Sequence, residues 1–206
     1  MKFLKIILFL FALMLSSCSE KFEKLSKKNS DREGLLKQIQ PEIKVKYWQL
    51  EHFPNFKDEN KKFEILYSKG QCTEKVKANI PTNDKDWNGF FSGCQPAFCA
   101  YRITYFENDQ WKTIKEEEEL KKIIGEIDNV SEAFLIGLIN DYSIDFNSEK
   151  GNGFIQETNG FKIKMVKYES CPISKESFTF FVNKNGSITN LKSNGYYLKS
   201  KDCIVY

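Results

Sequence analysis

Histidine and arginine are scarce in this chain of 206 residues, and both scarcities narrow its possible functions. His52 is the single histidine, which excludes zinc sites that need two histidines. Arg32 and Arg102 are the only arginines. Arginine makes most of the bidentate contacts with phosphate groups, so the chain has little of this chemistry. Because the formal net charge is also only +3, we expect no binding to nucleic acid.

Recognisable catalytic motifs are absent from the sequence as well. It contains no Gly-x-Ser-x-Gly elbow, no phosphate-binding loop and no dinucleotide-binding fingerprint. His52 lies beside an aromatic residue and close to a proline, where a lone histidine is more often structural than catalytic. We therefore predict no catalytic residue, no cofactor and no resident metal. A carboxylate-dependent hydrolase is an alternative, because the separation of acids such as Asp84, Asp86 and Glu107 depends on the fold.

The N-terminus has the pattern of an export signal. Lys2 and Lys5 are followed by an unbroken apolar run over residues 6–15. This run is well short of the ~20 residues that a membrane-spanning helix needs, and it matches the apolar centre of a signal peptide. The sequence therefore predicts an exported protein.

The end of this run, Leu15-Ser16-Ser17-Cys18, resembles the bacterial lipobox, in which an aliphatic residue and two small residues precede a lipidated cysteine. The resemblance implies a thioether-linked lipid on Cys18, acylation by groups such as palmitate, and cleavage after Ser17. Several acyl chains anchor a protein almost permanently, which implies a lipoprotein of the cell envelope. Ser19, at the next position, favours the outer membrane if the cell is Gram-negative. The alternative is an ordinary secretory signal in which Cys18 is incidental.

Cleavage would leave a nearly neutral mature chain of 189 residues, long enough for one domain. Two of the 31 basic residues leave with the signal, so 29 basic residues face 28 acidic ones. Residues 18–40 are polar and rich in lysine, and we interpret them as a tether to a single domain over residues 41–206. In composition and layout the mature domain resembles uncharacterised envelope lipoproteins of AT-rich Gram-negative bacteria. No motif carries this likeness, so it assigns no site.

Five further cysteines would form two disulfides and leave one thiol in an oxidising compartment. We predict a bond between Cys94 and Cys99, because a four-residue loop can close between them. We also predict a bond between Cys171 and Cys203, because both flank terminal strands. Two reduced buried cysteines or a metal site are the alternatives for Cys94 and Cys99, whose spacing is wider than in redox and most zinc motifs.

Strand patterns occupy both ends of the predicted domain. Residues 42–111 alternate between aromatic runs and turns, as short antiparallel strands do. Asn159-Gly160 is a strong two-residue hairpin signal, and this turn would place Phe154 opposite Met165. A second hairpin is expected around residues 183–186.

Two helices are predicted between these strands, over residues 114–125 and 131–142. Thr113 and Glu116 have capping-box spacing at the start of the first helix, and Ser131 is the expected N-cap of the second. The second helix is apolar on nearly every side, which suits the centre of a core. We therefore expect an α+β domain with an antiparallel sheet of short strands and hairpins and two consecutive helices packed on it.

Aromatic residues, concentrated in the first half of the domain, are the most suggestive feature for function. Trp48 and Trp87 lie beside polar residues and turns and are our candidates for a surface that binds a glycan or an envelope protein, with a β-rich core as the alternative. The glutamates at 116–119 are interpreted as a solvated first helical turn rather than a cation site. We expect a lipid-anchored, non-catalytic binding or assembly protein that contacts the membrane through Cys18. An envelope inhibitor or immunity lipoprotein against a toxin or hydrolase is the alternative.

Overall fold

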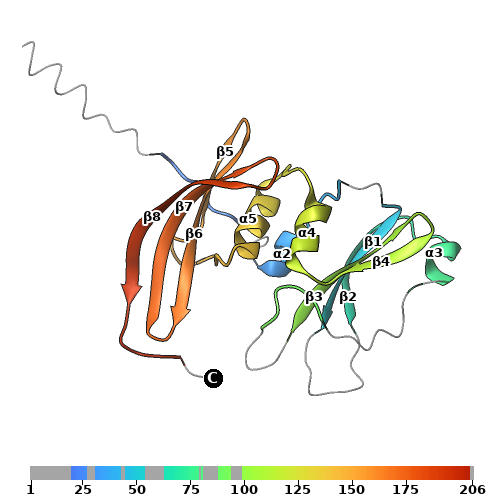
Figure 1. Ribbon diagram of the computed structural model, residues 1–206, viewed down its shortest axis with the longest axis horizontal. Helices are drawn as coiled ribbons and strands as arrows, with labels where there is room; N and C mark the ends of the chain where they lie inside the picture. The colour runs from blue at the N-terminus through green and yellow to red at the C-terminus, as the bar shows by residue number, and fades with distance from the viewer. Residues whose placement is uncertain are drawn as a thin grey trace, which may run out of the picture.

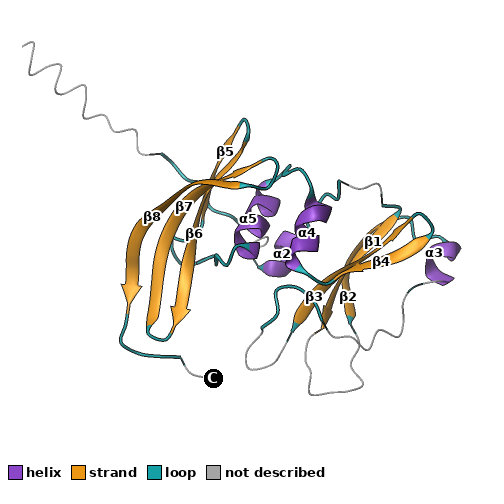
Figure 2. Ribbon diagram, in the orientation of Figure 1, coloured by secondary structure: helices purple, strands orange, loops and turns teal. Residues whose placement is uncertain are grey.

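The computed structural model describes residues 20–26, 31–42, 45–53, 63–78, 80, 88–93 and 99–204. Within these residues the chain forms two four-stranded antiparallel sheets and four helices (Figures 1 and 2). The predicted α+β class and antiparallel pairing are confirmed. The prediction of one sheet is wrong, because the strands separate into an N-terminal and a C-terminal sheet, and the packing of two consecutive helices on one common sheet is not confirmed.

The N-terminal sheet has the strand order β2-β1-β3-β4. Its β3–β4 hairpin turns through Asn108 and Asp109, whose φ angles of 49° and 61° suit a turn that favours these two residue types. The short helix α3 lies beyond the end of β2 (Figure 1). The element bounds are β1 Tyr47–Phe53, β2 Glu64–Gly70, α3 Glu74–Ala78, β3 Ala100–Glu107 and β4 Gln110–Ile114.

The C-terminal sheet follows the chain in the order β5-β6-β7-β8. The second predicted hairpin, around residues 183–186, is confirmed, because Val182 pairs with Ile188. The strands are β5 Gly153–Glu157, β6 Gly160–Ser170, β7 Ile173–Asn183 and β8 Ile188–Lys199.

The predicted register of the β5–β6 hairpin is wrong by two residues, since Phe154 lies opposite Ile163 and not Met165. Gly160 already pairs with Glu157 and begins β6 instead of forming the turn. A Cβ atom on Gly160 would lie 2.1 Å from the carbonyl oxygen of Val182. The glycine is therefore needed for close approach to β7, and the turn lies one residue earlier than its sequence signal suggests.

Three helices, α2 Arg32–Leu36, α4 Glu117–Ile124 and α5 Val130–Ile139, lie between the two sheets (Figure 2). The predicted first helix begins too early, because Ile114 still belongs to β4 and Thr113 pairs with Thr104 there. Glu116 precedes α4 without a side-chain cap, and Gly125, with a φ of 64°, follows its last residue.

Helix α5 begins and ends earlier than predicted, and its N-cap is Asn129 rather than Ser131. Asn129 and Glu132 form a reciprocal capping box, which fixes the start of the helix. The predicted central position of α5 is confirmed, because residues 133–136 are fully buried. One continuous core joins this helix to both sheets, with Leu50 and Ile103 on one side and Ile163 and Phe180 on the other.

The predicted tether over residues 18–40 is wrong for its described parts, which pack on the domain. Glu23 exchanges two backbone hydrogen bonds, of 2.9 and 2.8 Å, with Phe154 of β5. Leu25 is buried, and Leu35, Leu36 and Ile39 enter the core from α2 and the residues that follow it. A few apolar residues within a polar segment are therefore enough to hold it against the body.

The predicted disulfide between Cys171 and Cys203 is confirmed. Cys99 is also disulfide-bonded, whereas Cys94 of the second predicted pair lies outside the described residues. Cys72, just after β2, is an exposed free thiol. The C-terminal disulfide attaches the end of the chain to the connection between β6 and β7.

Candidate functional site

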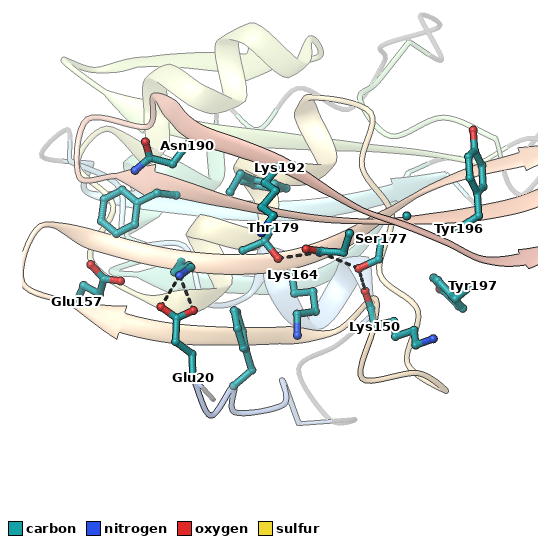
Figure 3. Close-up of a pocket in the computed structure, with 16 residues that line it drawn as sticks. Glu20, Lys150, Glu157, Lys164, Ser177, Thr179, Asn190, Lys192, Tyr196 and Tyr197 are labelled. Atoms are coloured by element: carbon teal, nitrogen blue, oxygen red, sulfur yellow. Dashed lines mark hydrogen bonds and ion pairs between the residues drawn. The ribbon is translucent and has the colours of Figure 1, made fainter. Parts of the chain in front are cut away.

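A groove of about 560 Å³ lies on the C-terminal sheet and is the candidate site (Figure 3). Side chains alternate along β6, so that Ile163 and Met165 are buried in the core while Lys162 and Lys164 point to the opposite face. The groove therefore lies on the face of the sheet that is turned away from the core. Its walls include residues 20 and 22, Lys150 from the connection between α5 and β5, and the edge strand β8.

Lysines give the groove its charge. Four lysines and two glutamates line it, Lys150, Lys162, Lys164, Lys192, Glu20 and Glu157. Strand pairing sets Lys164, Thr179 and Lys192 in one row across β6, β7 and β8. Thr179 on β7 thus lies between one lysine on β6 and one lysine on β8.

The lysines differ in how their charges are balanced. Glu20 accepts hydrogen bonds from Lys162 Nζ at 2.6 and 2.5 Å. Lys164 Nζ lies 4.0 Å from the ring centroid of Phe22, and Lys150 Nζ lies 5.7 Å from that of Tyr197. No described carboxylate lies within ion-pair distance of Lys150, Lys164 or Lys192. Their ammonium groups are therefore not held in ion pairs, although Lys164 helps Lys24 to lower the pKa of Glu149.

The floor of the groove is polar and internally hydrogen-bonded. Ser177 is buried on β7, and its hydroxyl donates to the carbonyl oxygen of Lys150 at 2.5 Å. Asn194 Nδ2 donates to Ser177 Oγ at 3.1 Å and to Thr179 Oγ1 at 2.8 Å. These bonds hold the connection that carries Lys150 against β7 and link β8 to β7. The groove is therefore formed before any ligand binds.

Asp145 fixes the same connection at a second point. Its carboxylate accepts hydrogen bonds of 2.7 Å from both Lys175 Nζ and Tyr197 Oη. Burial alone would raise the pKa of Asp145, but these hydrogen bonds outweigh it and hold the pKa below its usual value. Burial and the bond to Asp145 raise the pKa of Tyr197, so this phenol stays protonated and keeps donating.

This arrangement suits the binding of an anion. Four lysines and several polar side chains line one open concave face, and phosphate or carboxylate groups are the ligands that such side chains bind. The nearest hydroxyls, on Ser177 and Thr179, bond to a carbonyl and an amide rather than to a base that would activate them. Among the described residues, no three histidine, cysteine or acidic side chains group as metal ligands would.

The predicted binding residue Trp48 is not at this site, and the prediction is wrong for it. Its side chain is only 2% exposed and lies edge-on to Tyr67, with ring centroids 5.4 Å apart. Alternation along β1 places Trp48 and Leu50 in the main core. Trp87, the other predicted binding residue, lies outside the described residues. Trp48 therefore belongs to the core and not to a surface that binds a glycan or a protein.

The other sequence candidates have structural environments. His52 is half-buried against Tyr101, and burial lowers its pKa. Glu107 accepts a hydrogen bond of 2.7 Å from Lys112 Nζ, while Asp84 and Asp86 lie outside the described residues. The glutamates at 116–119 form the N-terminal turn of α4 instead of converging on a cation.

A buried polar cluster in the N-terminal sheet was not predicted from the sequence. Glu51 of β1 pairs with Arg102 of β3, and Gln49 donates a hydrogen bond to Glu51. The Arg102 guanidinium also lies 3.7 Å from the ring centroid of Phe63. These three polar residues are at most 6% exposed, which identifies a structural ion pair rather than a site open to a ligand.

Comparison with protein-family models, with curated proteins and with solved structures finds no match for this chain. Among the described residues, none of the helices is long and apolar enough to cross a membrane. What the groove binds must therefore be inferred from its own side chains. The pair Lys162 and Lys164, alternating with buried apolar residues in a hairpin strand, is the sequence signal that marks this face.

Proposed function

We propose that this protein is a lipid-anchored, non-catalytic binding protein of the cell envelope that holds an anionic partner in the groove of the C-terminal sheet. The anchor is the lipid on Cys18, as the lipobox resemblance implies. If the cell is Gram-negative, Ser19 favours the outer membrane. The disulfide between Cys171 and Cys203 supports export, because such bonds persist in oxidising compartments.

The charge of the groove is the observation that carries the proposed binding. Lys150, Lys164 and Lys192 line an open cavity with no described carboxylate at ion-pair distance, on a floor that hydrogen bonds already fix. Such a preformed cationic surface favours ligands that bear phosphate or carboxylate groups. An acidic segment of an envelope protein, an acidic glycan and a phosphate headgroup share this chemistry.

Fractionation of cells tests the anchor. The wild-type chain should be recovered with membranes and should yield an N-terminal peptide with the mass of a lipidated Cys18. The Cys18→Ser variant should lose the lipid and leave the membrane fraction. Recovery of both forms in the same fraction would contradict lipidation as the cause of attachment.

Photo-crosslinking in intact cells tests the groove. A photo-crosslinking amino acid in place of Tyr196, which lines the groove and is 52% exposed, should capture the partner. Capture should fall about ten-fold in a Lys164→Glu/Lys192→Glu variant, because two favourable charges become repulsive. A Lys69→Glu/Lys122→Glu variant makes the same change in net charge on β2 and α4 and should retain capture. Equal capture by both variants would contradict the groove as the binding site.

A further inference from the structure

The first described residues of the chain fix the distance between the proposed lipid and the groove. Glu20 forms part of the groove wall and is bonded to Lys162, and Phe22 lies against Lys164. Backbone bonds between Glu23 and Phe154 continue this attachment along β5. Only Ser19 separates Cys18 from Glu20. Because two residues span at most about 7 Å, the lipid would enter the membrane beside this wall of the groove.

This short distance brings the groove lysines close to the membrane surface. Charges within a Debye length of about 8 Å at physiological ionic strength are only partly screened. A basic residue near an anionic membrane strengthens binding to it, and basic clusters commonly act together with a covalently attached lipid. Lys164 lies against Phe22, four residues from Cys18, and Lys150 and Lys192 line the same groove without a described carboxylate at ion-pair distance.

The edge strand supplies an amphipathic side chain of the kind expected at a membrane interface. Tyr196 on the groove wall is 52% exposed. Tyrosine is enriched at the level of lipid headgroups, where its ring is in apolar surroundings and its hydroxyl in water. Tyr196 therefore adds an amphipathic ring to the wall that also carries the lysines.

We propose that the groove binds the phosphate headgroups of anionic phospholipids in the membrane that holds the lipid anchor, so that the outer face of the C-terminal sheet lies on the membrane. This inference rests on the proposed lipidation of Cys18 and names the ligand class of the proposed groove. The first described residues then form a short link between the lipid and the groove. The lipid and the lysines both hold the same face of the protein against the membrane.

Lysine acylation of the purified lipidated chain tests this orientation. The chain is reconstituted on vesicles of phosphatidylcholine alone or of phosphatidylcholine with phosphatidylglycerol, and modified lysines are quantified by mass spectrometry. Lys150, Lys164 and Lys192 should react about three-fold more slowly on the anionic vesicles, because phosphates hold their ammonium groups. Lys69 and Lys122, on β2 and α4, should react equally on both kinds of vesicle.

Two matched variants separate headgroup binding from a general effect of charge. In the Lys164→Glu/Lys192→Glu variant, Lys150 should react on anionic vesicles as fast as on neutral ones. In the Lys69→Glu/Lys122→Glu variant, Lys150 should stay protected. Near-ultraviolet circular dichroism of each variant checks that the fold is retained.

The possible failures are distinguishable. A lipidated chain whose groove lysines react equally on both vesicles would overturn the inference and leave the anchor standing. Equal protection by inorganic phosphate without vesicles would overturn it as well, since the groove would then take a free anion. A chain whose N-terminal peptide carries no lipid would overturn both the anchor and the orientation that depends on it.

Discussion

At the scale of single residues, Asp145 should make stability depend on pH. Hydrogen bonds from Lys175 and Tyr197 keep its folded pKa below the unfolded value of about 3.9. Between these two values the unfolded chain binds more protons, so this contribution is complete above the unfolded pKa and is lost as pH falls through the folded pKa. Urea unfolding at several pH values should show the advantage of wild type over Asp145→Asn shrinking below about pH 4.

Asp141→Asn is the matched control for this measurement. Asp141 is exposed, and its side chain makes no hydrogen bond with the rest of the described chain. The control should keep the pH dependence of the wild-type protein. A difference between wild type and Asp145→Asn that stays constant from neutral to acidic pH would contradict a role for the ionised carboxylate.

The pair of Glu51 and Arg102 illustrates what sequence reasoning misses at this scale. Tyr101, Ile103 and Tyr105 alternate along β3 and share its core-facing side, which leaves Arg102 on the opposite side, where a charged residue usually faces solvent. In the structure that second face is covered as well, and the charges are buried together. Which charges become buried depends on segments far apart in the chain, so no local pattern reveals the pair.

At the scale of elements, the Cys171–Cys203 disulfide should stabilise the C-terminal sheet by constraining the unfolded chain. The two cysteines are 32 residues apart and enclose β7 and β8. Cys171→Ser/Cys203→Ser should lower the free energy of unfolding by about 2–4 kcal/mol, as loop-closure entropy predicts. Urea denaturation measures the change, with Cys72→Ser as the control that removes an exposed free thiol. An unchanged midpoint for the double variant would contradict this contribution.

The type of element could be predicted from the sequence more reliably than its ends. The apolar residues all round helix α5 predict it, yet Asn129 caps the helix and not Ser131, which the sequence indicates. The Asn159-Gly160 signal located a hairpin, but contact between Gly160 and the backbone of β7 moved the turn by one residue. Local patterns specify which segments pair, whereas tertiary contacts decide the final register.

The same limit applies to the candidate site. Lys162 and Lys164 were visible in the sequence as the polar positions of a hairpin strand. Lys192 and Lys150 join them only because β8 pairs with β7 and Asp145 fixes the connection before β5. The segment around Leu25 has the polar composition of a tether, and its burial depends on a surface formed more than a hundred residues later.

At the scale of the whole molecule, the continuous core predicts that both sheets unfold together. Helices α2, α4 and α5 pack into one cluster with Leu50 and Ile103 of one sheet and Ile163 and Phe180 of the other. Neither sheet can lose its packing without exposing the helices that the other sheet also covers. We therefore expect a single cooperative transition, as for a small single domain.

Tryptophan fluorescence can test this coupling, because all three tryptophans, Trp48, Trp87 and Trp111, precede the C-terminal sheet in the sequence. Ile163→Val removes one buried methylene from the C-terminal sheet and should cost about 0.5–1.5 kcal/mol. It should shift the urea midpoint of fluorescence as far as that of far-ultraviolet circular dichroism, which reports on both sheets. Ile103→Val makes the same deletion in the N-terminal sheet and should shift both signals together too. A fluorescence midpoint that Ile163→Val leaves unchanged would show two independently folding halves, and the predicted single domain over residues 41–206 would then be wrong.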